Sequence, residues 1–223
     1  MLNEFGGSIR NMRLKKVKGA LERIEKSTYY VESPEQNKGK WKELFKNDNP
    51  IHIEIGMGKG NFIIEMSKRN PNINFIGIEM YDSVLVRAIE TLEDEEKEIP
   101  NLKLLLFDAR NIENIFDKEI EQIYLNFSDP WPKARHAKRR LTSSIFLEKY
   151  DKIFEADKSI IMKTDNDDLF DFSLETLSEH GYTFLEITRD LHSLNDENNV
   201  MTEYEKKFSE KGVKINRFKA ILK

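Results

Sequence analysis

The chain has 223 residues, of which 39% are hydrophobic and 34% charged, and its net charge is −4. It contains no cysteine, which excludes a disulfide framework and a thiolate metal site. With neither a signal-peptide pattern nor an apolar run of about 18 residues, the sequence predicts a cytoplasmic protein without a membrane anchor.

The basic residues are concentrated in two segments of an acidic chain. Residues 1–20 carry +4 and residues 133–140 carry +5, so the other 195 residues together hold −13. Two basic segments in an otherwise acidic chain are consistent with localised binding of a polyanion such as a nucleic acid. We expect residues 1–40 to form a partly ordered basic arm, which either contacts RNA or only aids solubility. Residues 41–223 are expected to form one domain.

After a short helix near residues 41–45, the chain alternates between β-prone runs and segments with helical periodicity. Strands are predicted over residues 51–55, 75–79, 102–107, 123–127, 159–162, 182–187 and 213–222. Helices are predicted between residue 61 and Pro71 and over residues 83–96, 142–155, 167–180 and 203–211, with a short helix or turn at 112–116 and a loop at 189–201. This alternation predicts an α/β fold whose parallel sheet is covered by helices.

Four acidic residues fall where predicted strands end: Glu54, Glu79, Asp108 and Asp129. In open α/β sheets ligands bind beyond the carboxyl ends of the strands, so these side chains are expected to converge on one crevice. A single carboxylate in such a place is explained as a helix cap, but four together favour a binding site.

The first predicted strand runs into a glycine-rich loop with Gly56, Gly58 and Gly60. The spacing G-x-G-x-G differs from the G-x-G-x-x-G of dinucleotide enzymes, and no phosphate-binding P-loop pattern is present. A ligand with an adenosine but no phosphate suits these residues, and S-adenosylmethionine is such a ligand. Glu79 can accept its ribose hydroxyls and Asp108 its adenine amino group, while the glycines let the backbone approach the methionine part.

The fourth predicted strand leads into the segment Asp129-Pro130-Trp131-Pro132. The two prolines disfavour the helical region for Asp129 and Trp131, which predicts an extended, stiff corner. A carboxylate beside an indole face can hold a guanine by hydrogen bonds and stacking. Basic side chains that follow would bind the surrounding phosphates: Lys133, Arg135, Lys138, Arg139 and Arg140. The alternative is a tight turn followed by a solvated basic helix start.

Several motifs together resemble one family. They are EIGMGKG from Glu54, LNFSDPWPK from Leu125, RHAKRR from Arg135, KTDN from Lys163 and TEYE from Thr202. In this order and spacing they are similar to the bacterial tRNA (guanine-N7-)-methyltransferase family, over most of residues 40–223. NFSDPWPK is highly specific to that family, whereas many methyltransferases share the glycine loop.

The resemblance implies a fold, an activity and a set of site residues. It implies a Rossmann-like class I methyltransferase with a seven-stranded, mostly parallel sheet, helices on both faces and an antiparallel last strand. The implied reaction moves a methyl group from S-adenosylmethionine to N7 of guanosine 46 in the tRNA variable loop. The implied cofactor contacts are Glu54, Glu79, Asp108 and Asp129, with Asp129 in the catalytic position. The implied RNA and substrate contacts are Lys133, residues 135–140, Asp165, Thr202, Tyr204 and Glu205.

Local alternatives exist for two of these motifs. Thr202 and Glu205 also form a capping-box pattern, in which Thr202 caps the next helix and Glu205 reaches back to the Thr202 amide. The segment from Lys163 to Asn166 also fits an Asx-type turn before a helix. The four histidines lack ligand spacing, so no metal is expected.

Two other functions remain open at this level. An exocyclic-amine RNA methyltransferase would place a similar acid-proline corner beside the base, and a non-catalytic module would bind S-adenosylmethionine or RNA without turnover. The sequence is compatible with a monomer and with a homodimer.

Overall fold

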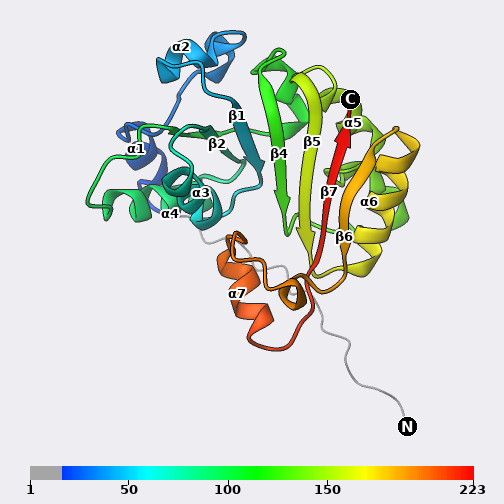
Figure 1. Ribbon diagram of the computed structural model, residues 1–223. Coiled ribbons are helices and arrows are strands. Elements are labelled where there is room, and N and C mark those ends of the chain that lie inside the picture. The colour runs from blue at the N-terminus through cyan, green and yellow to red at the C-terminus, as the bar shows by residue number, and fades with distance from the viewer. Residues whose placement is uncertain (1–16) are drawn as a thin grey trace.

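The computed structural model describes residues 17–223, which form one seven-stranded sheet (Figure 1). Its order is β3-β2-β1-β4-β5-β7-β6; β7 pairs antiparallel with both β5 and β6, and the other pairs of neighbouring strands are parallel. The strands are β1 (Ile51–Ile55), β2 (Asn74–Glu79), β3 (Leu102–Leu106), β4 (Ile120–Asn126), β5 (Phe154–Thr164), β6 (Thr183–Thr188) and β7 (Asn216–Leu222). The predicted fold class is confirmed.

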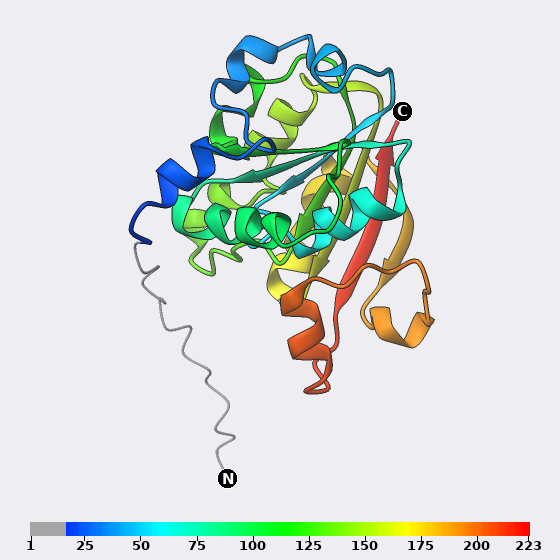
Figure 2. The same ribbon diagram turned by 90° about the vertical axis from the view of Figure 1, so that its left-hand side faces the viewer.

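Helices cover both faces of the sheet (Figures 1 and 2). One layer holds α1 (Ala20–Glu25), α3 (Asn61–Arg69) and α4 (Asp82–Glu93), and the other holds α2 (Trp41–Phe45), α5 (Ser144–Tyr150) and α6 (Asp167–Glu179). Helix α7 (Glu203–Ser209) lies beyond the C-terminal ends of the parallel strands. Four 3-10 helices complete the described chain: η1 (Pro34–Asn37), η2 (Ala109–Asn114), η3 (Ala134–Arg139) and η4 (Leu191–Leu194).

Strand β1 shows how the sequence produces the two layers. Because side chains alternate along a strand, Ile51, Ile53 and Ile55 all point into the core beneath α5 and α6. His52 points to the other face, where its ring meets Phe75 of β2 with centroids 5.6 Å apart. Burial on both faces explains why the parallel strands are nearly continuous apolar runs.

Strands β1 and β4 are neighbours at the point where the strand order reverses. The connections after β1 and β4 therefore leave on opposite sides and open a crevice at the C-terminal edge. Glu54 lies near the end of β1 and Asp129 just beyond β4, so both predicted site residues border this crevice.

The predicted arm differs from the structure in its extent. Residues 17–40 belong to the folded domain: Ile24 of α1 is fully buried, and Arg23 donates to Glu90 of α4 at 2.7 Å. Tyr30 pairs with Leu104 of β3 in an isolated bridge. Residues 1–16 hold a net charge of +3 out of the +4 of residues 1–40, and they lie outside the described residues.

Several element boundaries also differ from those predicted. The helix predicted over residues 142–155 ends at Tyr150, because the chain from Phe154 onward pairs with β4 and lengthens β5 at its start. Periodicity alone did not locate this change, since inward residues such as Leu147 and Phe154 suit either a helix or a strand. Within residues 17–223, no helix is both long and apolar enough to cross a membrane.

Candidate active site

The glycine-rich loop turns sharply between β1 and α3. Gly56, Gly58 and Gly60 all have positive φ, at 76°, 59° and 80°. Gly60 precedes α3, and a Cβ there would lie 3.0 Å from the Cβ of Ala88, so a side chain would push α4 away. Glycine is thus required both for the left-handed backbone and for the contact between the helices.

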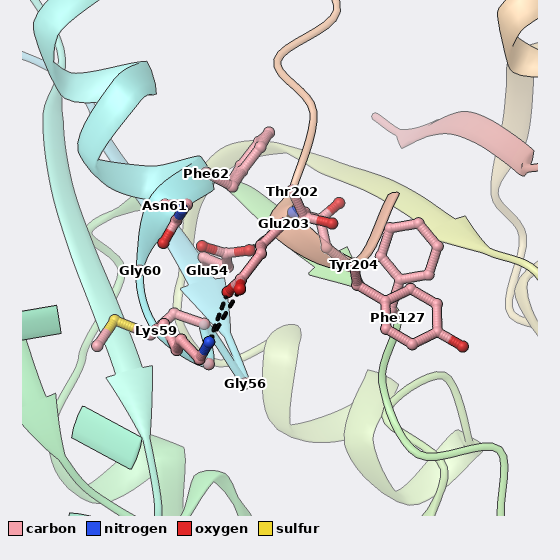
Figure 3. Close-up of a pocket in the computed structure, with 13 residues that line it drawn as sticks. Glu54, Gly56, Lys59, Gly60, Asn61, Phe62, Phe127, Thr202, Glu203 and Tyr204 are labelled. Carbon is pink, nitrogen blue, oxygen red and sulfur yellow. Dashed lines mark hydrogen bonds and ion pairs between the residues drawn. The ribbon is translucent and has the colours of Figure 1, made fainter. Parts of the chain in front are cut away.

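A pocket opens between this loop and α7 (Figure 3). Lys59 donates to Glu203 at 2.9 Å, so an ion pair joins the loop to the first turn of α7. The lining residues come from four segments: Glu54, residues 56–62, Asn126 with Phe127, and residues 202–204. Among the predicted site residues, the structure thus brings Glu54, the three glycines, Thr202 and Tyr204 together here.

Glu54 is the buried acid of this pocket, only 1% exposed. Asn126 Nδ2 donates to its Oε1 at 2.8 Å, while Glu54 Oε2 and Asn126 Oδ1 have no partner among the described residues. Burial raises the pKa of Glu54 to about 8. Two buried polar atoms without partners beside a pocket indicate a site for a ligand that donates hydrogen bonds.

Glu79, at the end of β2, organises the neighbouring backbone. Its Oε1 accepts from the amides of Met80 and Tyr81 at 2.8 and 3.1 Å, and its Oε2 accepts from Gly58 at 3.1 Å. Since each carboxylate oxygen accepts about two hydrogen bonds, one acceptor position remains, on Oε2. In this conformation Glu79 can accept from one ribose hydroxyl. The sequence had suggested that it accepts from both.

Asp108 and Asp129 lie at the same edge but outside the pocket lining. The Nε of Arg110 donates to Asp108 at 2.8 Å, and this hydrogen bond lowers the pKa of Asp108. Asp129 is exposed, and its charge contributes to the raised pKa of Glu79, whose largest cause is burial. Both acids belong to the carboxyl edge of the sheet, Glu79 at the end of β2 and Asp129 just beyond β4.

The proline corner is not extended as predicted. Trp131 has a φ of +43°, in the left-handed region. The guanidinium of Arg140 donates to two successive carbonyls, from Nε to Pro130 at 3.0 Å and from Nη2 to Trp131 at 3.3 Å. In an extended chain successive carbonyls point in opposite directions. Both carbonyls can face one guanidinium because the chain turns at Trp131.

The basic run forms η3, and its members have unequal environments. Lys133, Arg135, Lys138 and Arg139 are exposed, whereas Arg140 is only 9% exposed. The Cζ of Arg139 lies 4.9 Å from the centroid of the Trp131 ring. Four of the five predicted phosphate contacts are thus accessible, while Arg140 is largely buried.

Aromatic side chains line the side of the pocket next to α7. Tyr204 donates to Asp165 Oδ2 at 3.0 Å, and its ring stacks on Phe208 with centroids 4.1 Å apart. Its ring centroid also lies 4.8 Å from that of Phe127, whose φ is +52° (Figure 3). A hydrogen bond therefore joins Asp165 to Tyr204, which lines the pocket.

The capping box is only half formed. Thr202 Oγ1 accepts from the amide of Glu205 at 2.9 Å, as predicted, but the Glu205 carboxylate does not return to Thr202. It is fully buried and accepts from Lys163 at 2.9 Å and from Asn199 at 2.8 Å. Glu205 is thus buried on the inner side of α7, and the substrate contact that the resemblance implies for it stays a prediction.

Comparisons with known proteins identify the family. A sequence model described as a putative methyltransferase matches residues 48–218. The chain is 56% identical to the tRNA (guanine-N(7)-)-methyltransferase of Lachnoclostridium phytofermentans, over 94% of this chain and 98% of the relative. It is 52% identical to that of Bacillus cytotoxicus, over 94% and 96%. The chain belongs to the tRNA (guanine-N7-)-methyltransferase family.

Solved structures agree on the fold of this family member. An antibiotic-related methyltransferase superposes with a TM-score of 0.60 at 16% identity, covering 82% of this chain and 92% of the other. The 16S rRNA methyltransferase KamB gives 0.60 at 10% identity, covering 82% and 93%. The protein is a class I enzyme that depends on S-adenosylmethionine. The unpartnered atoms of Glu54 and Asn126 fit the hydrogen-bond donors of such a ligand.

The sequence analysis did not assign a contact to seven residues that line the pocket, which are Met57, Lys59, Asn61, Phe62, Asn126, Phe127 and Glu203, nor to Lys163, which lies outside the lining. Asn126 and Phe127 precede the proline corner and line the pocket, and Lys163 anchors α7. The positions of Asn126 and Phe127 at a strand end carried a signal, because strand ends border the crevice. No local signal identified the partner of Lys163, which lies 42 residues along the chain. Among residues 17–223, no cluster of three or more His, Cys, Asp or Glu is placed to bind a metal.

Proposed function

We propose that this member of the family methylates N7 of a guanosine in tRNA, and that this guanosine is position 46 of the variable loop. The observation that carries the proposal is the pocket at the carboxyl edge of the sheet, where buried Glu54 and Asn126 keep unpartnered oxygens and where Asp129 follows three residues after Asn126, the last residue of β4. The exposed basic residues of η3 follow the proline corner directly and supply contacts for a polyanion.

The cofactor is held at the carboxyl edge of β1, β2 and β3. Glu54 and Asn126 bind the amino acid part through their unpartnered atoms, and the glycine loop gives its backbone room. Glu79 would accept a ribose hydroxyl on Oε2, and Asp108 would accept from the adenine amino group. S-adenosylmethionine supplies an electrophilic methyl group bound to a sulfonium.

The substrate base is placed by acids and aromatic rings. Guanine N7 has a lone pair and no proton, so the new N–C bond forms as the C–S bond breaks and no base is needed. Asp129 holds the guanine and stabilises the positive charge that develops on the purine. Asp165, Lys133, Thr202 and Tyr204 complete the contacts to the substrate, and Arg135, Lys138 and Arg139 bind phosphates.

Incubation with methyl-labelled S-adenosylmethionine and unmodified tRNA transcript, followed by nucleoside analysis, tests this proposal. We expect the label in 7-methylguanosine, and a transcript with guanosine 46 replaced by adenosine should remain unlabelled. Label in an exocyclic amine would favour the second enzymatic function. Cofactor binding without labelling would favour a non-catalytic binding module.

The raised pKa of Glu54 predicts a pH-dependent cofactor affinity. In the folded protein its carboxyl stays neutral until the pH approaches 8, whereas its ordinary pKa is 4.5. The neutral Glu54 carboxyl therefore contributes fully to the free energy of unfolding below pH 4.5. This contribution is lost as the pH rises toward 8. A cationic amino group would favour the carboxylate, so binding should release a proton and tighten between about pH 5.5 and 7.5.

Calorimetric titration in two buffers of different ionisation enthalpy measures this proton release. The matched variant Glu54→Gln keeps the shape of the side chain but cannot ionise, so its affinity should be weaker and nearly independent of pH over that range. An equal pH dependence in the variant would assign the proton to another group.

A further inference from the structure

We infer that Arg140 is a positioning residue, which holds the Asp129-Pro130-Trp131-Pro132 corner in its turned form and does not bind RNA phosphate. The inference rests on the proposed function, since it assigns the corner to the reaction centre. It separates Arg140 from the other basic residues of the RHAKRR run, all of which the sequence alone groups together.

The first observation is the burial of the side chain. Arg140 is 9% exposed, whereas Arg135, Lys138 and Arg139 are exposed. Phosphate contacts need a guanidinium that reaches solvent, because the nucleic acid backbone approaches from outside. Arg140 has little surface left for such a contact.

The second observation is how the guanidinium is used. Its Nε and Nη2 donate to the carbonyls of Pro130 and Trp131, at 3.0 and 3.3 Å. The other side of the group is occupied by Phe172 of α6, with Cζ 4.3 Å from the ring centroid. A planar guanidinium suits this position, because one edge donates hydrogen bonds while one face stacks on an aromatic ring.

The third observation is the conformation that this contact stabilises. The φ of Trp131 is +43°, in the left-handed region that is strained for a residue with a bulky side chain. Hydrogen bonds from a charged donor to both flanking carbonyls offset such strain. Without them the corner would relax toward the extended form that the prolines favour, and Asp129, two residues before Trp131, would move with it.

Hydrogen bonds also fix the backbone of Arg140. The Arg140 amide donates to Ala137 at 3.0 Å, and its carbonyl accepts from Ser143 at 3.0 Å. Arg140 therefore connects the end of η3, the start of α5 and the surface of α6 to the corner. A rigidly held Arg140 can keep the Asp129 carboxylate aligned with the reacting base.

The test compares Arg140→Lys with Lys138→Gln, in assays of turnover and of tRNA binding at several salt concentrations. Lysine keeps the charge but loses the planar guanidinium, so we expect kcat to fall about tenfold or more with the salt slope unchanged. Lys138 is exposed, so Lys138→Gln should raise KM for tRNA and reduce the salt slope by about 0.7 to 0.9. A normal kcat in Arg140→Lys, or a salt slope reduced by about 0.7 to 0.9 in the neutral variant Arg140→Gln, would overturn the inference.

Two further measurements keep the test independent of the folding of one variant. Phe172→Leu removes the ring under the guanidinium without changing any charge, so it should lower kcat and be non-additive with Arg140→Lys.

Trp41 is fully buried, so acrylamide quenching of the two-tryptophan chain reports mainly Trp131 and should increase in both variants. Wild-type quenching and kcat in Phe172→Leu would contradict the inference. The quenching result also stands if the wild type makes no 7-methylguanosine, which would refute only the proposed function.

Discussion

Replacement of Asp129 by asparagine should reduce turnover about 100-fold to 1000-fold while the dissociation constant of S-adenosylmethionine changes little. Asparagine keeps the size and one acceptor of the side chain but removes the negative charge. That charge matters most when positive charge arrives on the purine, and it matters less for the bound cofactor. Single-turnover rates with saturating cofactor measure the first effect, and equilibrium titration measures the second.

Asp157→Asn provides the matched control for this prediction. Asp157 is also exposed, but it lies in the first half of β5, away from the carboxyl edge of the sheet. Its replacement should leave both turnover and cofactor affinity at the wild-type level. If Asp129→Asn lost turnover and cofactor affinity by the same factor, Asp129 would be a cofactor ligand and not the residue that stabilises the reacting base.

Removal of one partner of the buried Lys163–Glu205 pair should destabilise the protein by about 3–5 kcal/mol. The two side chains are 4% and 0% exposed, and Lys163 also donates to the carbonyl of Val200 at 2.8 Å. Burial lowers the pKa of Lys163, and the charge of Glu205 opposes this shift. Lys163→Met would leave the Glu205 carboxylate without its cation beneath α7.

Chemical denaturation of Lys163→Met and of the double variant Lys163→Met/Glu205→Leu measures this effect. The double variant should be the more stable of the two, because no buried charge is left alone. Lys26→Met, which breaks the exposed pair with Glu22, should leave the free energy of unfolding almost unchanged. A loss of less than about 1 kcal/mol in Lys163→Met would mean that α7 is held mainly by its apolar contacts.

The consequence for activity follows from the position of α7. This helix carries Thr202 and Tyr204 into the pocket, and Tyr204 is bonded to Asp165. Loosening the buried pair would misplace these residues even though neither Lys163 nor Glu205 lines the pocket. Folded Lys163→Met is thus expected to lose substrate affinity as well as stability.

Local sequence patterns determined the fold class and the parts of the site that depend on neighbouring residues. Apolar runs alternating with helical periodicity predicted the parallel sheet, because strand and helix periods are properties of consecutive residues. Gly56, Gly58 and Gly60 predicted the sharp loop after β1, since positive φ values need no distant partner. The acids at strand ends were predicted because parallel strands bring their carboxyl ends to one edge.

Only the tertiary structure decided what Arg140 and Glu205 do. Both belong to motifs that look like ligand contacts in sequence, yet Arg140 donates to Pro130 and Trp131, and Glu205 accepts from Lys163. Their burial comes from α6, β5 and α7 packing around them, and no local pattern encodes those contacts. A charged side chain has the same appearance in sequence whether it meets water, a ligand or a buried partner. The packing of distant segments decides which of these it meets, because burying a charge costs free energy unless a partner compensates it.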